Sequence, residues 1–390
     1  MAKKKAEGYL TAKESRRISR ENRRITNAME KKRKRKNVPE SEYLTTMHDP
    51  TNAVEFDDLH TYFFTDAGTV KSVDGVTFDV PIGKTVGVVG ESGCGKSVTS
   101  LSLMQLVQRP QGQIVSGEIR LNVGNKAYEI SKTPQEQMQH IRGNQVSMIF
   151  QEPMTSLNPV FRIGAQVDEV IALHDGEGKS KADIKSRTIE LLELVGIANS
   201  EGVYSMFPHE LSGGMRQRVM IAMALACNPR VIIADEPTTA LDVTIQAQIL
   251  DLLRQLKDQI NSAIMLITHD LGVIAEMADY VVVMYAGRIV EKGTAEDIFY
   301  HPAHPYTIGL MASKPVVGRQ VEELYSIPGK VPNPINMPNY CYFKDRCDKC
   351  LACCSGEYPK EISISETHKV SCYRYYEENL EKGGDTDVNE

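Results

Sequence analysis

The stretch "GESGCGKS" at residues 90–97 constrains the fold of this chain more than any other. It matches the pattern G-x-x-x-x-G-K-[ST], follows the apolar run "KTVGVVG" and precedes "KSVTSLSLMQLV", whose spacing predicts a helix. Glycines let the backbone N–H groups of such a loop turn towards phosphate oxygens, and the following helix N-terminus favours negative charge. We therefore predict that Lys96 reaches the β- and γ-phosphates of a nucleotide and that Ser97 ligates Mg²⁺.

Short apolar strands alternate with helix-length segments around this loop, which predicts an α/β fold with a parallel sheet. The expected strands include "VKSVDGVTFDV", "QVSMIF", "RVIIADEP", "AIMLITHD" and "YVVVMYAGRIV", and "ALDVTIQAQILDLLRQLKDQI" is an expected helix. No apolar run approaches the roughly 18 residues that span a bilayer. The basic N-terminus lacks the apolar segment of a secretory signal, so we expect a cytosolic protein that does not cross a membrane by itself.

Two further patterns fit phosphate chemistry. Asp235 and Glu236 end the apolar strand "VIIADEP", where one carboxylate can hold Mg²⁺ and the next can polarise a water molecule. In "LSGGMRQR", Ser212 and two glycines open an amphipathic helix, which makes a second anion-binding helix start. Two such starts are redundant for one nucleotide in one chain, but they suit two chains that close over shared nucleotides.

The ordered set "GESGCGKS", Gln151, "LSGGMRQR", "VIIADEP", "ALD" and His269 resembles the ATP-binding cassette (ABC) ATPases over about residues 52–310. The resemblance implies a P-loop cassette with a parallel core sheet, an antiparallel β subdomain and a helical signature subdomain. It also implies that the Ser212 loop contacts the γ-phosphate held by a partner chain.

The resemblance assigns a role to individual residues. Glu236 is the expected general base, His269 the γ-phosphate switch, and Gln151 a sensor of Mg²⁺ and of the membrane partner. Asp235 is expected at Mg²⁺ together with Ser97 and Gln151. The expected nucleotide contacts are Gly90, Glu91, Ser92, Gly93, Cys94, Gly95, Lys96, Ser97, Val98, Ser212, Gly213, Gly214 and Asp242, the last at the dimer seam. Of the aromatic residues in "TYFF", Phe64 is favoured for stacking on adenine, with core packing as the alternative.

Three stretches narrow the resemblance to the ATP-binding subunits of oligopeptide and dipeptide importers: "FQEPMTSLNP", "FPHELSGGMRQR" and "HPAHPYTIGL". That similarity continues through "SIPGKVPNP" and implies an ATP-hydrolysing subunit at the cytoplasmic face of the membrane. Its implied partners are a second cassette, for which a sibling subunit is favoured over a copy of this chain, two transmembrane permeases and an extracytoplasmic solute-binding protein, with no nucleic acid. The alternatives are an ABC ATPase that acts on ribosomes or nucleic acid and a regulatory ATPase with a redox sensor.

The two ends of the chain differ from this cassette, which we place at residues 51–310. Residues 1–36 hold fifteen Lys or Arg against four Glu, a net charge of +11, so the other residues carry −17. Because residues 1–50 are polar and basic, we expect a mobile extension. It is a solvated tail or a segment attracted to an anionic membrane, with nucleic-acid binding as a third alternative that the lack of interleaved aromatic residues disfavours. Residues 311–390, rich in Pro and Cys, are expected to form a separate small region.

Six of the eight cysteines lie in that last region, which in a reducing cytosol favours metal binding over disulfides. Spacing alone highlights Cys347, Cys350 and Cys353, a C-x₂-C-x₂-C run that suits an iron–sulfur cluster or zinc. The family resemblance selects Cys341, Cys347, Cys354 and Cys372 instead and implies a structural [4Fe–4S] cluster. Zinc, reduced thiols and a disulfide remain the alternatives, and Cys350 and Cys353 exceed what the cluster needs.

Overall fold

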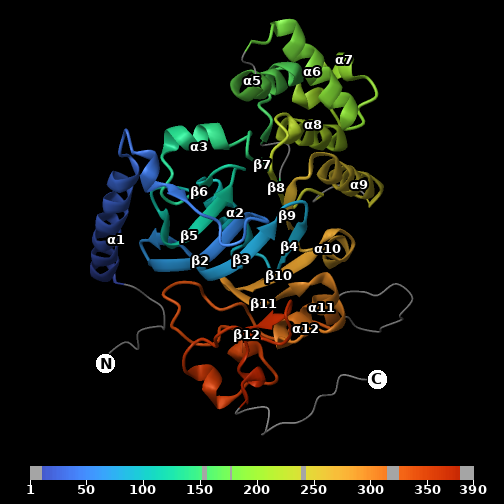
Figure 1. Cartoon of the computed structure of the whole chain (residues 1–390). Coiled ribbons are helices and arrows are strands. Elements are labelled where there is room, and N and C mark those ends of the chain that lie inside the picture. The colour runs from blue at the N-terminus through green and yellow to red at the C-terminus, as the bar shows by residue number, and fades with distance from the viewer. Residues whose placement is uncertain (1–10, 152–155, 176–177, 239–242, 314–324, 378–390) are drawn as a thin grey trace.

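The computed structural model describes residues 11–151, 156–175, 178–238, 243–313 and 325–377. Within them lie two sheets, a group of helices beyond one edge of the larger sheet, and a C-terminal region at its other edge (Figure 1). The expected α/β cassette is confirmed, since parallel strands form the centre of the larger sheet.

The larger sheet has eight strands, of which β10, β4, β9, β8 and β7 run parallel. Its spatial order is β12 (Ile362–Ser363), β13 (Lys369–Val370), β11 (Arg288–Thr294), β10 (Tyr280–Tyr285), β4 (Thr85–Val89), β9 (Ala263–Ile267), β8 (Val231–Asp235) and β7 (Val146–Ile149). Every residue of β4, β7, β8 and β9 is buried. This burial explains why these strands read as continuous apolar runs rather than as alternating patterns.

The smaller sheet has five antiparallel strands in the order β1 (Leu44–Thr45), β6 (Ala127–Glu129), β5 (Gly112–Asn122), β2 (Asn52–Thr65) and β3 (Gly68–Pro81). Its β2–β3 hairpin packs against β4 and α2, so both sheets share one hydrophobic core that includes Phe56, Val76, Val88 and Leu103.

The helices are α1 (Ala12–Arg33), α2 (Lys96–Leu103), α3 (Gln135–Ile141), α5 (Ile163–Asp175), α6 (Lys181–Leu194), α7 (Ser200–Tyr204), α8 (Gly213–Leu225), α9 (Val243–Ile260), α10 (Leu271–Met277), α11 (Ala295–Tyr300) and α12 (Pro305–Ala312). Helices α5, α6, α7 and α8 gather beyond the β7–β8 edge (Figure 1). Helix α2 is shorter than the apolar pattern "KSVTSLSLMQLV" predicts. In the described residues no helix is both long and apolar enough to span a bilayer.

Helix α1 corrects the expectation that residues 1–50 form a mobile extension, because residues 12–33 are helical and docked. A capping box at Thr11 and Glu14 starts the helix, and the basic residues of its last turn complement the helix dipole. It docks through polar contacts: the Asn22 amide donates to the carbonyl of Thr65 at 2.7 Å, and Arg109 lies 2.8 Å from Glu30. Composition alone missed the helix because its docking does not depend on apolar burial.

The C-terminal region is joined to the cassette rather than separate from it. Strand β13 pairs with β11 and so extends the larger sheet. Tyr342, Phe343 and Cys354 belong to the same hydrophobic core as the helices α5–α8. Two short helical turns, Lys344–Arg346 and Ala352–Ser355, lie within the cysteine-rich sequence, and the second contains Cys353 and Cys354.

Candidate active site

The phosphate-binding loop, residues 90–97, connects β4 to α2, and its glycines are required by geometry. Gly90, Gly93 and Gly95 have φ angles of 148°, 78° and 105°. A Cβ atom on Gly90 would lie 2.2 Å from the carbonyl oxygen of Met284, and one on Gly95 would lie 2.2 Å from that of Ser72. The loop therefore adopts a conformation and a packing that side chains at these positions would prevent.

The ammonium group of Lys96 is folded inside this loop. Its Nζ donates to the carbonyl oxygens of Gly90 at 2.7 Å and Glu91 at 3.0 Å. Cys94 is buried beside it, and burial raises the pKa of its thiol. An ammonium group has three N–H donors, and the third points to Cys94 Sγ at 3.8 Å, a long contact that a phosphate oxygen can replace.

Two predicted magnesium ligands meet at the start of α2. The hydroxyl of Ser97 donates to the Asp235 carboxylate at 3.1 Å, although the two residues are 138 positions apart. The pKa of Asp235 is raised, mainly by burial and also by the charge of Glu236, although the hydrogen bond from Ser97 acts to lower it. A hydroxyl and a carboxylate are the hard oxygen ligands that Mg²⁺ takes alongside phosphate and water, so these residues fit that ion.

The three predicted catalytic residues lie together at the ends of adjacent strands. The amide of Gln151, which follows β7, donates to Glu236 Oε2 at 2.8 Å. Nδ1 of His269, which follows β9, lies 3.3 Å from Glu236 Oε1. Glu236 itself has a φ of 48°, and its N–H donates to the carbonyl of Ile267 at 2.8 Å. The arrangement holds one carboxylate between an amide and an imidazole.

The Ser212 loop belongs to the helical group. Ser212 caps α8 by accepting a hydrogen bond from the N–H of Met215 at 3.3 Å, and the side chain of Ser212 is exposed. Among the described residues, and apart from its chain neighbours and its own helix backbone, no heavy atom lies within 4 Å of a Cβ built on Gly213, while one on Gly214 would lie 3.2 Å from Ile245. Figure 1 shows α8 apart from α2, at whose start the phosphate-binding loop lies. This helix start is therefore open to a second molecule.

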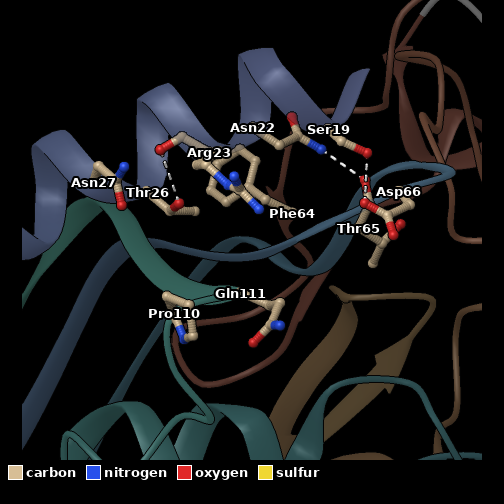
Figure 2. Close-up of a pocket in the computed structure, with 10 residues that line it drawn as sticks. All are labelled: Ser19, Asn22, Arg23, Thr26, Asn27, Phe64, Thr65, Asp66, Pro110 and Gln111. Carbon is tan, nitrogen blue, oxygen red and sulfur yellow. Dashed lines mark hydrogen bonds between the residues drawn. The ribbon is translucent and has the colours of Figure 1, made fainter. Parts of the chain in front are cut away.

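Two predicted nucleotide contacts need separate comment. Asp242 lies outside the described residues. Phe64 lines a pocket of about 400 Å³ between α1 and the β2–β3 hairpin. In Figure 2 its ring lies between the helix and the strands, beside Arg23 and Thr26 of α1. None of the residues that line this pocket comes from the phosphate-binding loop.

The four cysteines selected by the family resemblance share one neighbourhood. Cys341, Cys354 and Cys372 are buried and Cys347 is half-buried, whereas Cys350 and Cys353 are exposed. Burial, together with the charge of nearby thiols, raises the pKa of Cys341 and of Cys347 to about 12 and that of Cys372 to about 11. None of the eight cysteines, all of which are described, forms a disulfide.

These thiols fit an iron–sulfur cluster or zinc in chemistry but not in arrangement. Over the described part of the chain, no three His, Cys, Asp or Glu side chains are placed to hold a metal ion. Binding such a group therefore requires the thiols to move together and to lose their protons.

Two contacts of the phosphate-binding loop were not predicted from the sequence. Arg346 forms a bidentate ion pair with Glu91, and the hydroxyl of Tyr306 accepts a hydrogen bond from the Glu91 N–H at 2.8 Å. Tyr306 lies in "HPAHPYTIGL", and Arg346 lies in "CYFKDRC" between Cys341 and Cys347, two of the cysteines that the family resemblance selects. Their place in these stretches was the only sequence feature that pointed to the two residues. It does not predict that they contact the phosphate-binding loop.

The fold and the geometry of this site define an ATP-binding cassette. The chain matches the family model described as ABC transporter over residues 73–239, and the model described as Oligopeptide/dipeptide transporter, C-terminal region, over residues 290–354. A dimeric post-hydrolysis structure of the ATP-binding cassette MJ0796 with ADP and Pi is similar in fold, with a TM-score of 0.55 and 24% identity. That likeness covers 62% of this chain and 98% of the other.

Sequence relatives specify the family further. The oligopeptide transport ATP-binding protein AppD of Bacillus subtilis (strain 168) is 49% identical over 84% of this chain and 98% of that protein. The oligopeptide transport ATP-binding protein OppD of Salmonella typhimurium is 45% identical over 87% of this chain and 99% of that protein. The chain belongs to the ABC transporter family, among the ATP-binding proteins of oligopeptide/dipeptide transporters, and is an ATPase. These matches give no support to a role on ribosomes or nucleic acid.

Proposed function

We propose that this chain powers the import of oligopeptides or dipeptides through a membrane ABC transporter. The observation that carries the proposal is its 49% identity, over 84% of its length, to an oligopeptide transport ATP-binding protein. The oligopeptide/dipeptide C-terminal region at residues 290–354 supports it independently of the cassette. The chain then works at the cytoplasmic face of the membrane as a peripheral subunit.

The site supports a division of roles in hydrolysis. Lys96 binds the β- and γ-phosphates, while Ser97, Asp235 and Gln151 hold Mg²⁺, which supplies charge neutralisation when bound. Glu236 accepts a proton from the attacking water. Its position between Gln151 and His269 keeps the carboxylate oriented and lets both neighbours respond to the γ-phosphate.

The open start of α8 supports a two-chain cycle. Ser212, Gly213 and Gly214 contact the γ-phosphate bound by a second cassette, which is a sibling subunit, and Asp242 lies at the seam. A γ-phosphate held from both sides binds the closed dimer more tightly than the open one, which is the differential affinity that drives closure. Two permease subunits and an external solute-binding protein complete the assembly.

Phe64 is our choice for the residue that stacks on adenine. Its ring is only partly buried and forms a wall of the pocket beside α1, so a face is accessible to a base. Tyr62 is a weaker choice because its hydroxyl is held by Asp74 at 2.5 Å.

We also propose that Cys341, Cys347, Cys354 and Cys372 take up a structural [4Fe–4S] cluster, with Zn²⁺ as the alternative. Their burial and their shared neighbourhood support this set over Cys350 and Cys353. Iron and acid-labile sulfide assays on anaerobically purified protein test the proposal. Cys354→Ser should abolish iron binding and Cys353→Ser should preserve it; the reverse result would reject this ligand set.

Purification of the intact assembly tests the import function. The chain carries an affinity tag, is extracted from native membranes in mild detergent, and its partners are identified by mass spectrometry. We expect two permease subunits with membrane spans and a second ATP-binding subunit. Recovery of ribosomal proteins or nucleic acid without permeases would overturn the proposal.

A further inference from the structure

We propose that Arg346 is a positioning residue for the phosphate-binding loop, and that the cysteine-rich segment, residues 341–372, fixes the loop through it. Nη1 of Arg346 donates to Glu91 Oε2 at 2.9 Å, and Nη2 donates to Oε1 at 3.0 Å. The two side chains are only 7% and 24% exposed. A paired, shielded guanidinium–carboxylate contact of this kind fixes both distance and orientation.

Arg346 is itself held on the side away from the loop. Its Nε donates to the carbonyl of Pro328 at 2.9 Å, and Nη1 also donates to the hydroxyl of Tyr285 at 3.3 Å. Arg346 ends a short helical turn and is followed directly by Cys347. The position of the guanidinium group therefore depends on how the cysteine-rich segment is folded.

Glu91 connects Arg346 to Lys96 through hydrogen bonds. Its carboxylate is held by Arg346, its N–H by the hydroxyl of Tyr306 at 2.8 Å, and its carbonyl accepts from Lys96 Nζ at 3.0 Å. One residue thus separates Arg346 from the lysine that meets the phosphates. A shift of Arg346 reaches the nucleotide site without passing through the hydrophobic core.

An aromatic cluster supplies a second connection. Phe343 of the cysteine-rich segment lies 5.2 Å from Tyr285 and 5.5 Å from Tyr306, measured between ring centroids, and Tyr285 lies 4.7 Å from Tyr306. Tyr306 is the residue whose hydroxyl meets the Glu91 N–H. The segment and the loop therefore move as one unit, and nucleotide affinity and order in the segment are reciprocally linked.

ATP affinity of the purified full-length chain, measured calorimetrically with Mg·ATP, tests the proposal. Arg346→Met should weaken binding about tenfold, as expected for loss of hydrogen bonds to a charged group. Glu91→Gln should weaken ATP binding too. The double variant should bind ATP about as tightly as the single variant with the lower affinity, because both substitutions break the same contact. Arg346→Lys should restore part of the affinity. The loss should appear in KM for ATP rather than in kcat.

A matched control and a second readout separate positioning from general stability. Lys349→Met removes an exposed lysine of the same segment and should leave ATP affinity unchanged. Mg·ATP should slow tryptic cleavage of the segment in the wild-type chain but not in Glu91→Gln, whose substitution lies outside the segment. This second readout decides the matter even if Arg346→Met does not fold. Additive losses in the double variant, wild-type affinity in Glu91→Gln, or equal protection in that variant would overturn the proposal.

Discussion

Glu236 combines a left-handed backbone conformation, with a φ of 48°, with a carboxylate held by two neighbouring strand ends. Few non-glycine residues adopt such a φ, and those that do concentrate at functional sites. The backbone hydrogen bond to Ile267 and the contacts to Gln151 and His269 hold this strained residue in place. The carboxylate is therefore oriented before any nucleotide arrives.

Replacing Glu236 by Gln removes the proposed proton acceptor but keeps the size of the side chain. Phosphate release should fall by about 10² to 10⁴, the usual cost of losing a general base, while ATP binding persists. Size-exclusion chromatography should then show an ATP-dependent dimer that does not turn over. The control Glu296→Gln, at an exposed position of α11, should hydrolyse ATP normally. Wild-type phosphate release by Glu236→Gln would contradict the assignment.

His304 provides a residue-scale test of the C-terminal packing. Burial lowers its pKa to about 4, and the charge of Glu291 only partly offsets this. Between the ordinary pKa of about 6.5 and that lower value, the unfolded chain binds a proton that the folded chain does not. The free energy of unfolding should therefore fall with decreasing pH in this window, by at most about 1.4 kcal/mol per pH unit.

Thermal unfolding across that pH range checks this expectation. His304→Asn keeps a side chain that can accept the helix-capping hydrogen bond from Tyr306 but removes the titration. It should flatten the acid dependence, whereas His301→Asn, at an exposed position of the same motif, should not. An identical slope in the His304 variant would contradict a buried, neutral imidazole.

At the scale of elements, helix α1 shows that composition alone does not predict whether a polar, basic segment folds. Its buried side chains are Asn22 and Thr26 rather than apolar residues, and Glu30 anchors its C-terminal end to Arg109 and Gln113. Partial burial acts to raise the pKa of Glu30, but hydrogen bonds from those two partners outweigh it and lower the pKa. The anchor is therefore present above the usual carboxyl pKa and is lost as pH falls through the lowered one.

Glu30→Gln should release α1 from the cassette. Loss of a charged hydrogen-bond acceptor costs roughly 1.5 to 3 kcal/mol, which corresponds to at least about tenfold faster tryptic cleavage at the many Lys and Arg residues of the helix. Glu21→Gln, at an exposed position of the same helix, is the control. Equal cleavage rates in the two variants would show that Glu30 does not anchor α1.

Sequence patterns predicted the parts of the site whose geometry depends on a few consecutive residues. The glycine pattern at residues 90–97 demands the observed positive φ values, and a strand that ends in Asp235 and Glu236 meets Ser97 because parallel strands share one carboxyl edge. Gln151 and His269 carry no such local signal, and their roles came from the family resemblance alone. The Arg346–Glu91 pair joins positions 255 apart, so no local rule could identify it.

At the scale of the whole molecule, the larger sheet arranges the function. Its parallel strands bring Gln151, Glu236 and His269 together at their carboxyl ends. Strand β13 pairs with β11 on the side of the sheet away from β7 and ties the cysteine-rich segment to the cassette. Helix α8, which Ser212 caps, lies apart from α2, at whose start the phosphate-binding loop is found (Figure 1). This separation supports the proposal that one chain supplies two half-sites and that a second cassette completes each of them.

Transport by the reconstituted assembly tests the central claim most directly. The complex purified through a tag on this chain is placed in proteoliposomes with ATP on the cassette side, and uptake of a radiolabelled oligopeptide is measured with its solute-binding protein present. We predict ATP-dependent uptake that Glu236→Gln abolishes and Glu296→Gln preserves. Uptake that continues at the wild-type rate with Glu236→Gln, or ATP hydrolysis without any peptide uptake, would contradict the account.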